Sequence, residues 1–193
     1  MVQVVLASRN LHKLEEIRRM RPDIHWLSMP AELPDPPETG ATFIENALQK
    51  ATFVFASTGL PCLADDSGLE VDFLGGKPGV HSKRYSDEGT DAANNAKLLA
   101  ALAGQEQRGA RYRCVLALVA PSGIATVSGS CEGQIGHHPR GSGGFGYDPL
   151  FVATAIPEKT VAELTAAEKD AISHRGAAMA RLNELFRAAG LFL

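Results

Sequence analysis

The chain has 193 residues, of which 45% are hydrophobic and 21% charged, and its formal net charge is −3. These values are typical of a compact globular protein and exclude the disordered, collagen-like and coiled-coil classes. Because positive and negative charges nearly balance, the composition provides no basic surface for nucleic acid or for an anionic membrane. We therefore expect neither as a partner, whereas a small polyanion would need only a few well-placed cations.

The three cysteines, Cys62, Cys114 and Cys131, are far apart and show no C-x-x-C spacing. Neither a disulfide framework nor a zinc site is predicted, and a reducing, cytoplasmic location fits this usage. The first residues lack a basic region ahead of an apolar stretch, and no run reaches the roughly 18 apolar residues of a membrane helix. No targeting or anchoring segment is expected.

The first third of the chain is expected to alternate between strands and helices. Residues 2–7 form an apolar, valine-rich run typical of a buried strand, and apolar residues then recur at helical spacing over 14–20. A second strand is expected over 24–28. The segment 29–40 contains four prolines in twelve residues and predicts an irregular loop.

A capping box marks the start of the next helix, because Thr42 is followed three residues later by Glu45. Helical spacing then continues until Gly59, which predicts the end of that helix. A short strand is expected to follow and to end at Asp65 and Asp66, where the chain enters a turn.

The middle of the chain predicts a surface helix over 90–102 and two paired strands, 111–120 and 124–135, about a Pro-Ser-Gly turn. That hairpin would make part of the sheet antiparallel. Residues 137–149 contain four glycines and predict a second irregular loop.

The last part of the chain predicts helices. Thr165 and Glu168 form another capping box, and the segment 173–176 is expected to separate two short helices. Apolar residues at helical spacing, Met179 and Phe186 among them, then predict a terminal helix. We expect a single α/β domain over residues 1–193.

Residues 7–13, A-S-R-N-L-H-K, are the first candidate site because they lead from a strand into a helix. Backbone N–H groups and the positive end of a helix bind phosphate, and Lys13 would add a charge. The segment does not match either glycine-rich phosphate signature, and Ser and Asn in such turns also simply cap the helix.

Asp65 and Asp66 are the second candidate. Consecutive residues of an extended chain point to opposite sides, so only one carboxylate is expected to enter a given cleft. Mg²⁺ is commonly bound by one or two carboxylates together with substrate phosphates. The alternative is an Asx-turn completed by the following Ser and Gly.

Phe145 is the third candidate, because the glycines on either side allow a flat ligand to approach its ring closely. The alternative is an ordinary loop with Phe145 packed into the core. Lys169, Ser173, His174 and Arg175 are the fourth candidate and bring two cations to one helix junction, although basic residues on helices are usually solvated. No Ser or Cys has the sequence context of an acyl-transfer triad.

Six ordered motifs resemble the inosine triphosphate pyrophosphatase family over almost the whole chain. They are S-R-N-L-H-K, P-P-E-T-G-A-T-F-I-E-N-A, L-A-D-D-S-G-L-E-V, G-G-x-P-G-V-H-S, G-G-F-G-Y-D-P-L-F and A-E-L-T-A-A-E-K-D-A-I-S-H-R-G. The resemblance implies Mg²⁺-dependent hydrolysis of ITP, dITP and XTP to the monophosphate and pyrophosphate, which cleanses the nucleotide pool. It also implies an α/β fold with a mixed, twisted sheet flanked by helices, two lobes around a central cleft, and a homodimer.

The same resemblance assigns roles to individual residues. Asp66 would be the catalytic base and, with Glu38, a metal ligand. Phe145 would stack on the purine. The residues expected to line the substrate are Ser8, Arg9, Asn10, Leu11, His12, Lys13, Lys50, Ser67, Phe145, Gly146, Tyr147, Asp148, Lys169, His174 and Arg175. Of these, Ser8, Asn10, Lys13 and Lys50 would contact the phosphates, and the family often has glycine at the position of Arg9.

Two other classes of function fit parts of the pattern. A nucleotidyl- or glycosyltransferase would use the aspartates with a metal, and a nucleotide sensor would use the basic and aromatic residues for binding alone. Release of free pyrophosphate without a transferred nucleotidyl group separates hydrolysis from transfer.

Overall fold

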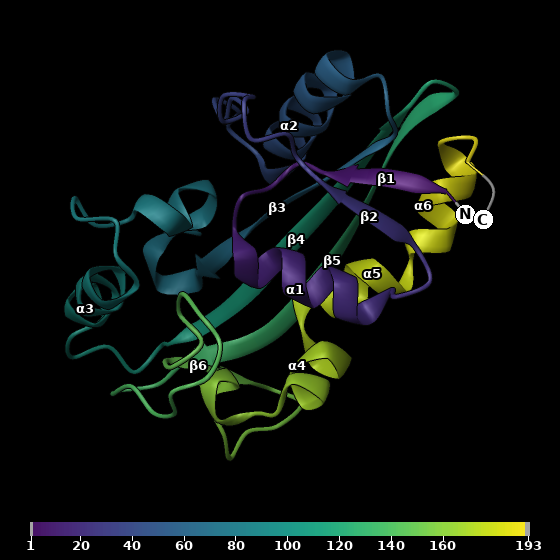
Figure 1. The fold of residues 1–193 in the computed structure, drawn as a ribbon. Coiled ribbons are helices and arrows are strands. Elements are labelled where there is room, and N and C mark those ends of the chain that lie inside the picture. The colour runs from purple at the N-terminus through teal and green to yellow at the C-terminus, as the bar shows by residue number, and fades with distance from the viewer. Residues whose placement is uncertain (1, 192–193) are drawn as a thin grey trace. The chain divides into compact units, whose positions relative to one another are not determined.

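The protein folds as a six-stranded mixed sheet flanked by helices (Figure 1), as seen in a computed structural model that describes residues 2–191. The strands are β1 (Gln3–Leu6), β2 (His25–Ser28), β3 (Cys62–Val71), β4 (Gly109–Ala120), β5 (Gly123–Ile135) and β6 (Phe151–Ala153). The helices are α1 (Leu11–Met20), α2 (Phe43–Thr58), α3 (Asp91–Ala101), α4 (Ala166–Ile172), α5 (His174–Ala180) and α6 (Leu182–Ala188). Short 3₁₀ turns are η1 (Asp72–Leu74), η2 (Gly79–Arg84) and η3 (Val161–Glu163).

The strand order β2-β1-β3-β4-β5-β6 confirms the predicted mixed sheet. β1 pairs in parallel with β2 and with β3, whereas β5 and β6 are antiparallel. β4 and β5 are neighbours in the sheet, and the two residues between them are too few for anything but an antiparallel hairpin.

The chain divides into two compact units. Unit 1 contains residues 2–66, 114–129 and 178–191, and unit 2 contains 67–113 and 130–177. β3, β4 and β5 contribute residues to both units. The predicted cleft between two lobes and the prediction of one catalytic domain over the whole chain stay predictions.

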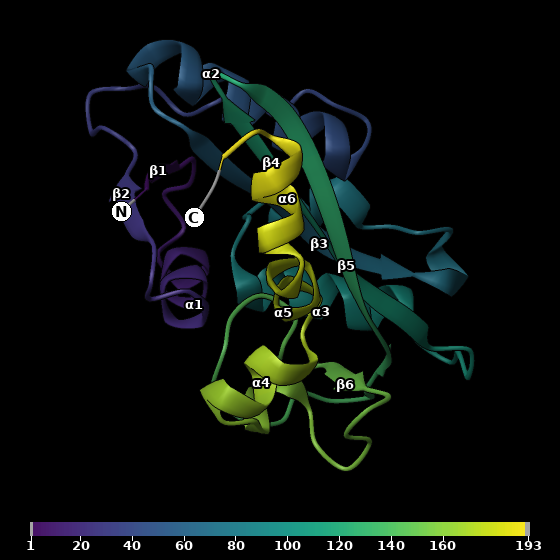
Figure 2. The same ribbon diagram turned by 90° about the vertical axis from the view of Figure 1, so that its right-hand side faces the viewer.

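In unit 1, side chains alternate between the two faces of the sheet, as strand geometry requires. Val4 and Leu6 of β1 belong to a cluster with α1 and α6, whereas Val5 and Ala7 belong to a cluster with α2. Figure 2 shows α6 alongside β4 and β5, and its buried Phe186 packs in the first of these clusters. The strands of this unit are therefore covered by helices on both faces.

Unit 2 has its own core. Leu69 of β3, Leu98 of α3, Tyr112 of β4 and Phe151 of β6 are buried together in it. The rings of Tyr112 and Phe151 lie 4.6 Å apart between centroids. This core includes Tyr147 and Leu150, so the end of the glycine-rich loop packs in the interior, whereas residues 137–144 are exposed.

The helix boundaries follow the local signals. The Thr42 hydroxyl accepts a hydrogen bond from the Glu45 N–H at 3.2 Å, and the Glu45 carboxylate accepts one from the Thr42 N–H at 3.1 Å. Gly59 ends α2 with φ of 69°, a left-handed conformation that a side chain would disfavour. The capping box at Thr165 is also present.

Two expectations about secondary structure were wrong. β3 does not end at Asp65 and Asp66 but continues to Val71, because two lysines satisfy these carboxylates and neighbouring strands flank them. Tertiary pairing outweighs the turn preference of D-D-S-G. The expected terminal helix is interrupted at Arg181, which separates α5 from α6.

No helix within residues 2–191 is both long and apolar enough to cross a membrane.

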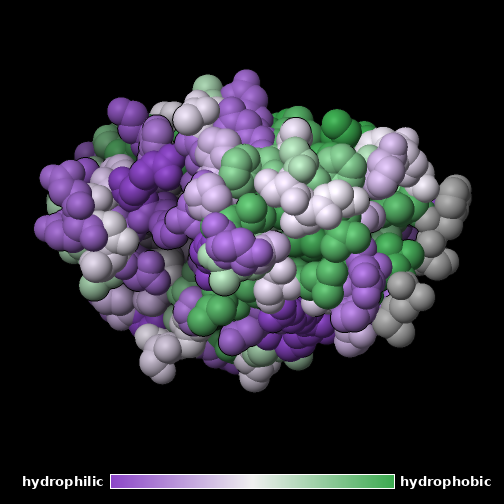
Figure 3. Space-filling view, turned by 45° about the horizontal axis from the view of Figure 1, so that its top comes forward, coloured by the Kyte–Doolittle hydropathy of each residue, from purple (hydrophilic) through white to green (hydrophobic). Residues whose placement is uncertain are grey.

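The face in Figure 3 carries hydrophilic as well as hydrophobic residues, and Leu11 and Ile124 are among the exposed large hydrophobic side chains. Cys62, Cys114 and Cys131 are buried and free.

Candidate active site

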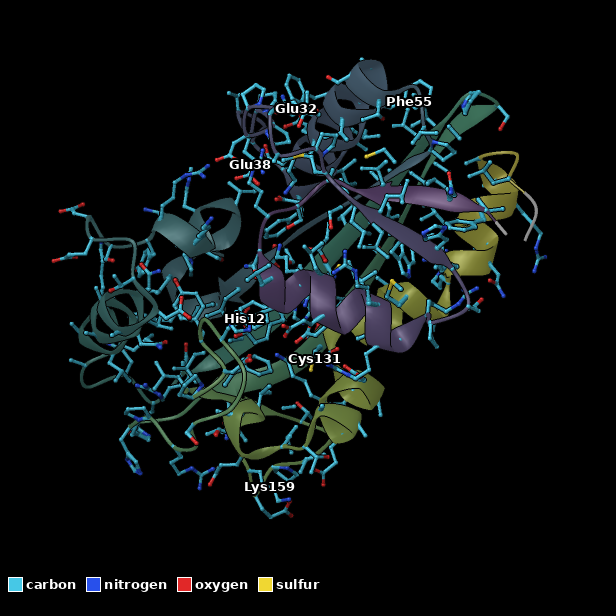
Figure 4. All side chains as sticks on the ribbon, viewed as in Figure 1. His12, Glu32, Glu38, Phe55, Cys131 and Lys159 are labelled. Carbon is cyan, nitrogen blue, oxygen red and sulfur yellow. The ribbon has the colours of Figure 1, made fainter. Side chains whose placement is uncertain are left out.

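A buried lysine in unit 1 lies between two carboxylates. Lys50 Nζ donates to Glu38 Oε1 at 2.8 Å, to Asp66 Oδ1 at 2.6 Å and to the Asp65 carbonyl at 2.9 Å. Lys50 lies on α2 and Asp66 on β3. Glu38, which Figure 4 labels, lies in the proline-rich loop ahead of α2. The family resemblance implied Glu38 and Asp66 as metal ligands and Lys50 as a contact to the triphosphate, and the structure brings these three side chains together.

Burial and neighbouring charges shift the pKa values of Lys50 and Asp66 in opposite directions. Burial alone would lower the pKa of Lys50, but the neighbouring carboxylates of Asp66 and Glu38 outweigh it and raise that pKa above its usual value. Burial raises the pKa of Asp66, and this effect exceeds the opposing attraction of Lys50 and Lys13. Lys50 therefore stays charged, and Asp66 holds a proton more readily than an exposed aspartate.

Asp65 faces the other side of β3, as predicted for consecutive residues of a strand. Its Oδ1 accepts a hydrogen bond from Lys13 Nζ at 2.5 Å, and its Oδ2 accepts one from Cys114 Sγ at 3.1 Å. Asp65 therefore holds Lys13, a residue expected to contact phosphate, through a direct ion pair. Sequence reasoning missed Cys114, because a lone cysteine in an apolar strand carries no signal beyond burial.

The loop ahead of α1 is a helix cap. Asn10 Oδ1 accepts a hydrogen bond from the Lys13 N–H at 3.3 Å, and Ser8 Oγ accepts one from the Asn10 N–H at 3.1 Å. The capping alternative is therefore confirmed for Asn10, and phosphate binding by this loop stays a prediction. Leu11 and His12 are exposed in the first turn of α1, where Figure 4 labels His12.

Arg9 is directed at the proline-rich loop. Its Nε donates to Asp35 Oδ1 at 2.9 Å, and its Nη2 donates to the carbonyls of Pro30, Ala31 and Leu33. The Arg9 side chain therefore fastens residues 30–35 to the segment that follows β1. Its predicted contact with substrate remains untested.

The oxygen ligands available for a metal are few. Within residues 2–191, no group of three or more His, Cys, Asp or Glu side chains could hold a metal ion. Glu38 and Asp66 nevertheless converge, because both accept hydrogen bonds from the same Lys50 Nζ. Two carboxylates without nitrogen or sulfur ligands fit Mg²⁺, which usually takes its other ligands from phosphates and water.

Unit 2 contains a second group of charged side chains, and they are buried. The exposed fraction is 7% for Lys169, 6% for His174 and 0% for Arg175. The alternative that these are ordinary solvated helix residues is therefore wrong. Arg175 Nη2 donates to Ser67 Oγ at 3.0 Å, which brings the fourth candidate group to β3.

Phe145 lies among these cations. Lys169 Nζ is 4.6 Å and Arg175 Cζ is 6.0 Å from the centroid of its ring, distances typical of cation–π contacts. Phe145 is only partly buried and is not among the buried core residues of the described chain. The core alternative for this residue is therefore not supported.

Asp148 connects Phe145 with Lys169. Its Oδ2 accepts hydrogen bonds from Lys169 Nζ at 2.7 Å and from the Phe145 N–H at 2.9 Å, and its Oδ1 accepts one from the Tyr112 hydroxyl at 3.2 Å. Gly144 approaches this carboxylate so closely that a Cβ there would collide with it. The close approach at Gly144 therefore accommodates Asp148, and the approach of a flat ligand to Phe145 stays a prediction.

Gly146, which follows Phe145, forms hydrogen bonds with two side chains of α3. The Gly146 N–H donates to Asp91 Oδ2 at 2.6 Å, and Asn95 Nδ2 donates to the Gly146 carbonyl at 2.9 Å. Sequence reasoning missed both side chains, since neither belongs to a recognised motif. Tyr147 packs in the core, and its hydroxyl donates a hydrogen bond to the Ser82 carbonyl at 2.8 Å. Its side chain therefore stabilises the fold of unit 2.

Gly176 allows the α4–α5 junction to form beside Arg175. A Cβ at this position would collide with the Asp170 carbonyl oxygen and lie 3.2 Å from Ser173 Oγ. We expect Gly176→Ala to lower the free energy of unfolding by roughly 1–3 kcal/mol through overpacking. Thermal unfolding measures this, with Gly136→Ala as the control because its Cβ would meet only ordinary contacts. Equal melting temperatures for the two variants would contradict the close contact at Gly176.

The fold is that of solved Ham1 proteins. It superposes on a HAM1 protein from Coxiella burnetii with a TM-score of 0.86 at 43% identity, covering 97% of this chain and 99% of that one. A dITP/XTP pyrophosphatase structure from Mycobacterium abscessus gives a TM-score of 0.76 at 47% identity, over 94% and 98% of the two chains.

The chain belongs to the Ham1 family, whose model matches residues 4–185. A relative from Nocardia farcinica, named dITP/XTP pyrophosphatase, is 53% identical over 193 aligned residues, covering 94% of this chain and 93% of its own. The match spans both units, which confirms the family inferred from the six motifs.

Proposed function

We propose that this protein hydrolyses non-canonical purine nucleoside triphosphates, namely dITP, XTP and ITP, to the nucleoside monophosphate and pyrophosphate. The observation that carries the proposal is the buried Lys50 between Glu38 and Asp66, which gathers a cation, a base and oxygen ligands at one point. The names of its relatives in Nocardia farcinica and Mycobacterium abscessus, both dITP/XTP pyrophosphatases, support the same substrate class.

The triphosphate is assigned to the residues around Lys13 and Lys50. It carries about four negative charges, which Lys13, Lys50 and the N-terminus of α1 partly offset. Mg²⁺ held by Glu38 and Asp66 would supply further neutralisation and stabilise the leaving pyrophosphate. This local set of cations explains how a protein with a net charge of −3 binds a polyanion.

Asp66 is assigned the role of general base. It accepts a proton from a water molecule as the water oxygen attacks the α-phosphorus, and the bond from that phosphorus to the bridging oxygen breaks. The electron pair of that bond leaves with pyrophosphate. Burial raises the pKa of Asp66, so this carboxylate accepts a proton more readily than an exposed aspartate does.

The purine is assigned to Phe145 and the cations beside it. The partly exposed ring of Phe145 offers a stacking surface, and the buried Lys169 and Arg175 supply donors beside it. Hypoxanthine and xanthine carry a keto oxygen at position 6, an acceptor, where adenine carries an amino donor. Donors aimed at that edge favour the two keto purines over adenine.

Phe145→Ala is expected to raise KM for dITP more than it lowers kcat. Stacking on a base is worth about 1–3 kcal/mol and is made equally in the ground state and the transition state. Steady-state kinetics checks this, with Phe73→Ala as the control because Phe73 is a 44% exposed phenylalanine in η1. An unchanged KM in Phe145→Ala would remove the ring from the binding site.

We also propose, from the family resemblance, that the protein is a cytoplasmic homodimer that cleanses the nucleotide pool. Light scattering after gel filtration measures the oligomeric state directly, and a monomer mass of 20.5 kDa at micromolar concentration would contradict the dimer.

A panel of dITP, ITP, XTP, ATP and GTP tests the proposed function. With Mg²⁺ we expect monophosphate from the first three and little from the last two, and we expect EDTA to abolish turnover. Binding of dITP without turnover would favour a sensor, and transfer of the nucleotidyl group to an acceptor would favour a transferase. Either result would overturn the proposal.

A further inference from the structure

We propose that Tyr112 is a positioning residue that fixes both Asp148 and His174 for recognition of the purine. The inference rests on the proposed function, and it concerns only residues of unit 2. Tyr112 lies on β4, and its hydroxyl and ring contact Asp148, Phe151 and His174, so it acts through its neighbours rather than by touching substrate.

The hydroxyl of Tyr112 holds one oxygen of Asp148. It donates to Asp148 Oδ1 at 3.2 Å, while Asp148 Oδ2 accepts from Lys169 Nζ and from the Phe145 N–H. The carboxylate is therefore held on both oxygens, and the two groups on Oδ2 are the cation and the backbone of the stacking ring. A carboxylate free to rotate would no longer keep Lys169 and Phe145 in one arrangement.

The ring of Tyr112 holds His174. The two rings are stacked, with centroids 4.7 Å apart and planes inclined by 14°. His174 is 6% exposed and begins α5, directly before Arg175. Stacking on a ring anchored in the sheet restricts the orientation of the imidazole at the start of this helix.

The surroundings of Tyr112 make it a rigid support. Its ring lies against Phe151 of β6 in the core of unit 2, with centroids 4.6 Å apart. Burial, together with the charge of Asp148, raises the pKa of its hydroxyl well above the usual value. The hydroxyl therefore remains protonated and keeps donating over the whole working range of pH.

Two substitutions separate the two contacts. Tyr112→Phe removes the hydroxyl and keeps the ring, and Tyr112→Leu removes both. We expect Tyr112→Phe to raise KM for dITP roughly tenfold with kcat within about twofold, because a hydrogen bond to a charged group is lost. Tyr112→Leu is expected to raise KM further. Tyr85→Phe is the matched control, since Tyr85 lies in the same unit and no hydrogen bond of its hydroxyl to a site residue is seen in the described chain.

Calorimetric titration with inosine monophosphate gives a second readout that needs no turnover. We expect Tyr112→Phe to weaken this binding by about the same factor as KM, while the calorimetric affinity for pyrophosphate remains unchanged because the phosphates are assigned to Lys13 and Lys50, not to the residues that Tyr112 contacts. If Tyr112 had only a structural role, Tyr112→Phe would weaken the binding of inosine monophosphate and of pyrophosphate alike, or would lower only the melting temperature.

The outcomes distinguish the two proposals. Failure of the wild-type protein to release pyrophosphate overturns the proposed function, and the calorimetric comparison then decides the role of Tyr112 alone. Wild-type KM and wild-type affinity for inosine monophosphate in Tyr112→Phe would overturn the positioning role, even with the proposed function intact. Failure of the wild type to bind inosine monophosphate at millimolar concentration would overturn it as well.

Discussion

Asp66→Asn is expected to lower kcat for dITP by about 10² or more, the usual size of a lost general base. The asparagine keeps the size of the side chain, but it neither accepts a proton from water nor offers Mg²⁺ a charged oxygen. Because Lys50 would lose one of its two carboxylate partners, circular dichroism must first show that the variant is folded. Steady-state release of pyrophosphate then measures the loss.

Asp23→Asn is the control for this experiment, because Asp23 is an exposed carboxylate of unit 1 that pairs only with Arg21 among the ion pairs of the described chain. We expect its turnover to equal that of the wild type. Near-normal turnover in Asp66→Asn would instead move the role of base to Asp65 or to another group.

Removal of Arg175 is expected to reduce kcat/KM for ITP strongly and to alter base selection. Arg175→Gln keeps most of the volume of this fully buried side chain but removes its charge, and Arg175→Ala removes both. A donor that faces the 6-keto oxygen rejects adenine, because its amino group would leave that donor unpaired. Sites of this kind discriminate by as much as ~10⁴-fold.

Guanine shares the 6-keto group, so Arg175 cannot exclude GTP by the same contact. The ratio of kcat/KM between ITP and ATP is therefore expected to narrow more than the ratio between ITP and GTP. Arg113→Ala provides the control, because Arg113 is an exposed arginine of unit 2 paired with Glu70. If both ratios stay fixed while activity falls, Arg175 binds the sugar or a phosphate rather than the base edge.

Local signals in the sequence were sufficient for most elements. The capping boxes at Thr42 and Thr165 and the left-handed glycine at position 59 act within one turn of the chain, and all three are present in the structure. The end of β3 was predicted wrongly because the length of this strand depends on residues far away in the sequence. Lys13 and Lys50 neutralise Asp65 and Asp66, and nothing within the segment D-D-S-G indicates these ion pairs.

The residues of the candidate site also fall into two groups, those that the sequence motifs indicate and those that only long-range contacts reveal. Residue types with evident chemistry, such as Asp66, Lys50 and Arg175, were predicted as site residues from the motifs, although the complete burial of Arg175 was not expected. Residues that act through a neighbour, Tyr112 and Asn95, could not be identified. Their importance comes from contacts with Asp148 and Gly146, which are formed only when distant segments pack together.

The most direct test of the account is the phosphate product of dITP hydrolysis. Pyrophosphate and orthophosphate are measured in parallel from one reaction with Mg²⁺, without added pyrophosphatase. The proposed function predicts one pyrophosphate for each deoxyinosine monophosphate formed, with no orthophosphate in the initial phase. Orthophosphate together with deoxyinosine diphosphate as the first products would contradict it, because the bond broken would then lie between the β- and γ-phosphorus.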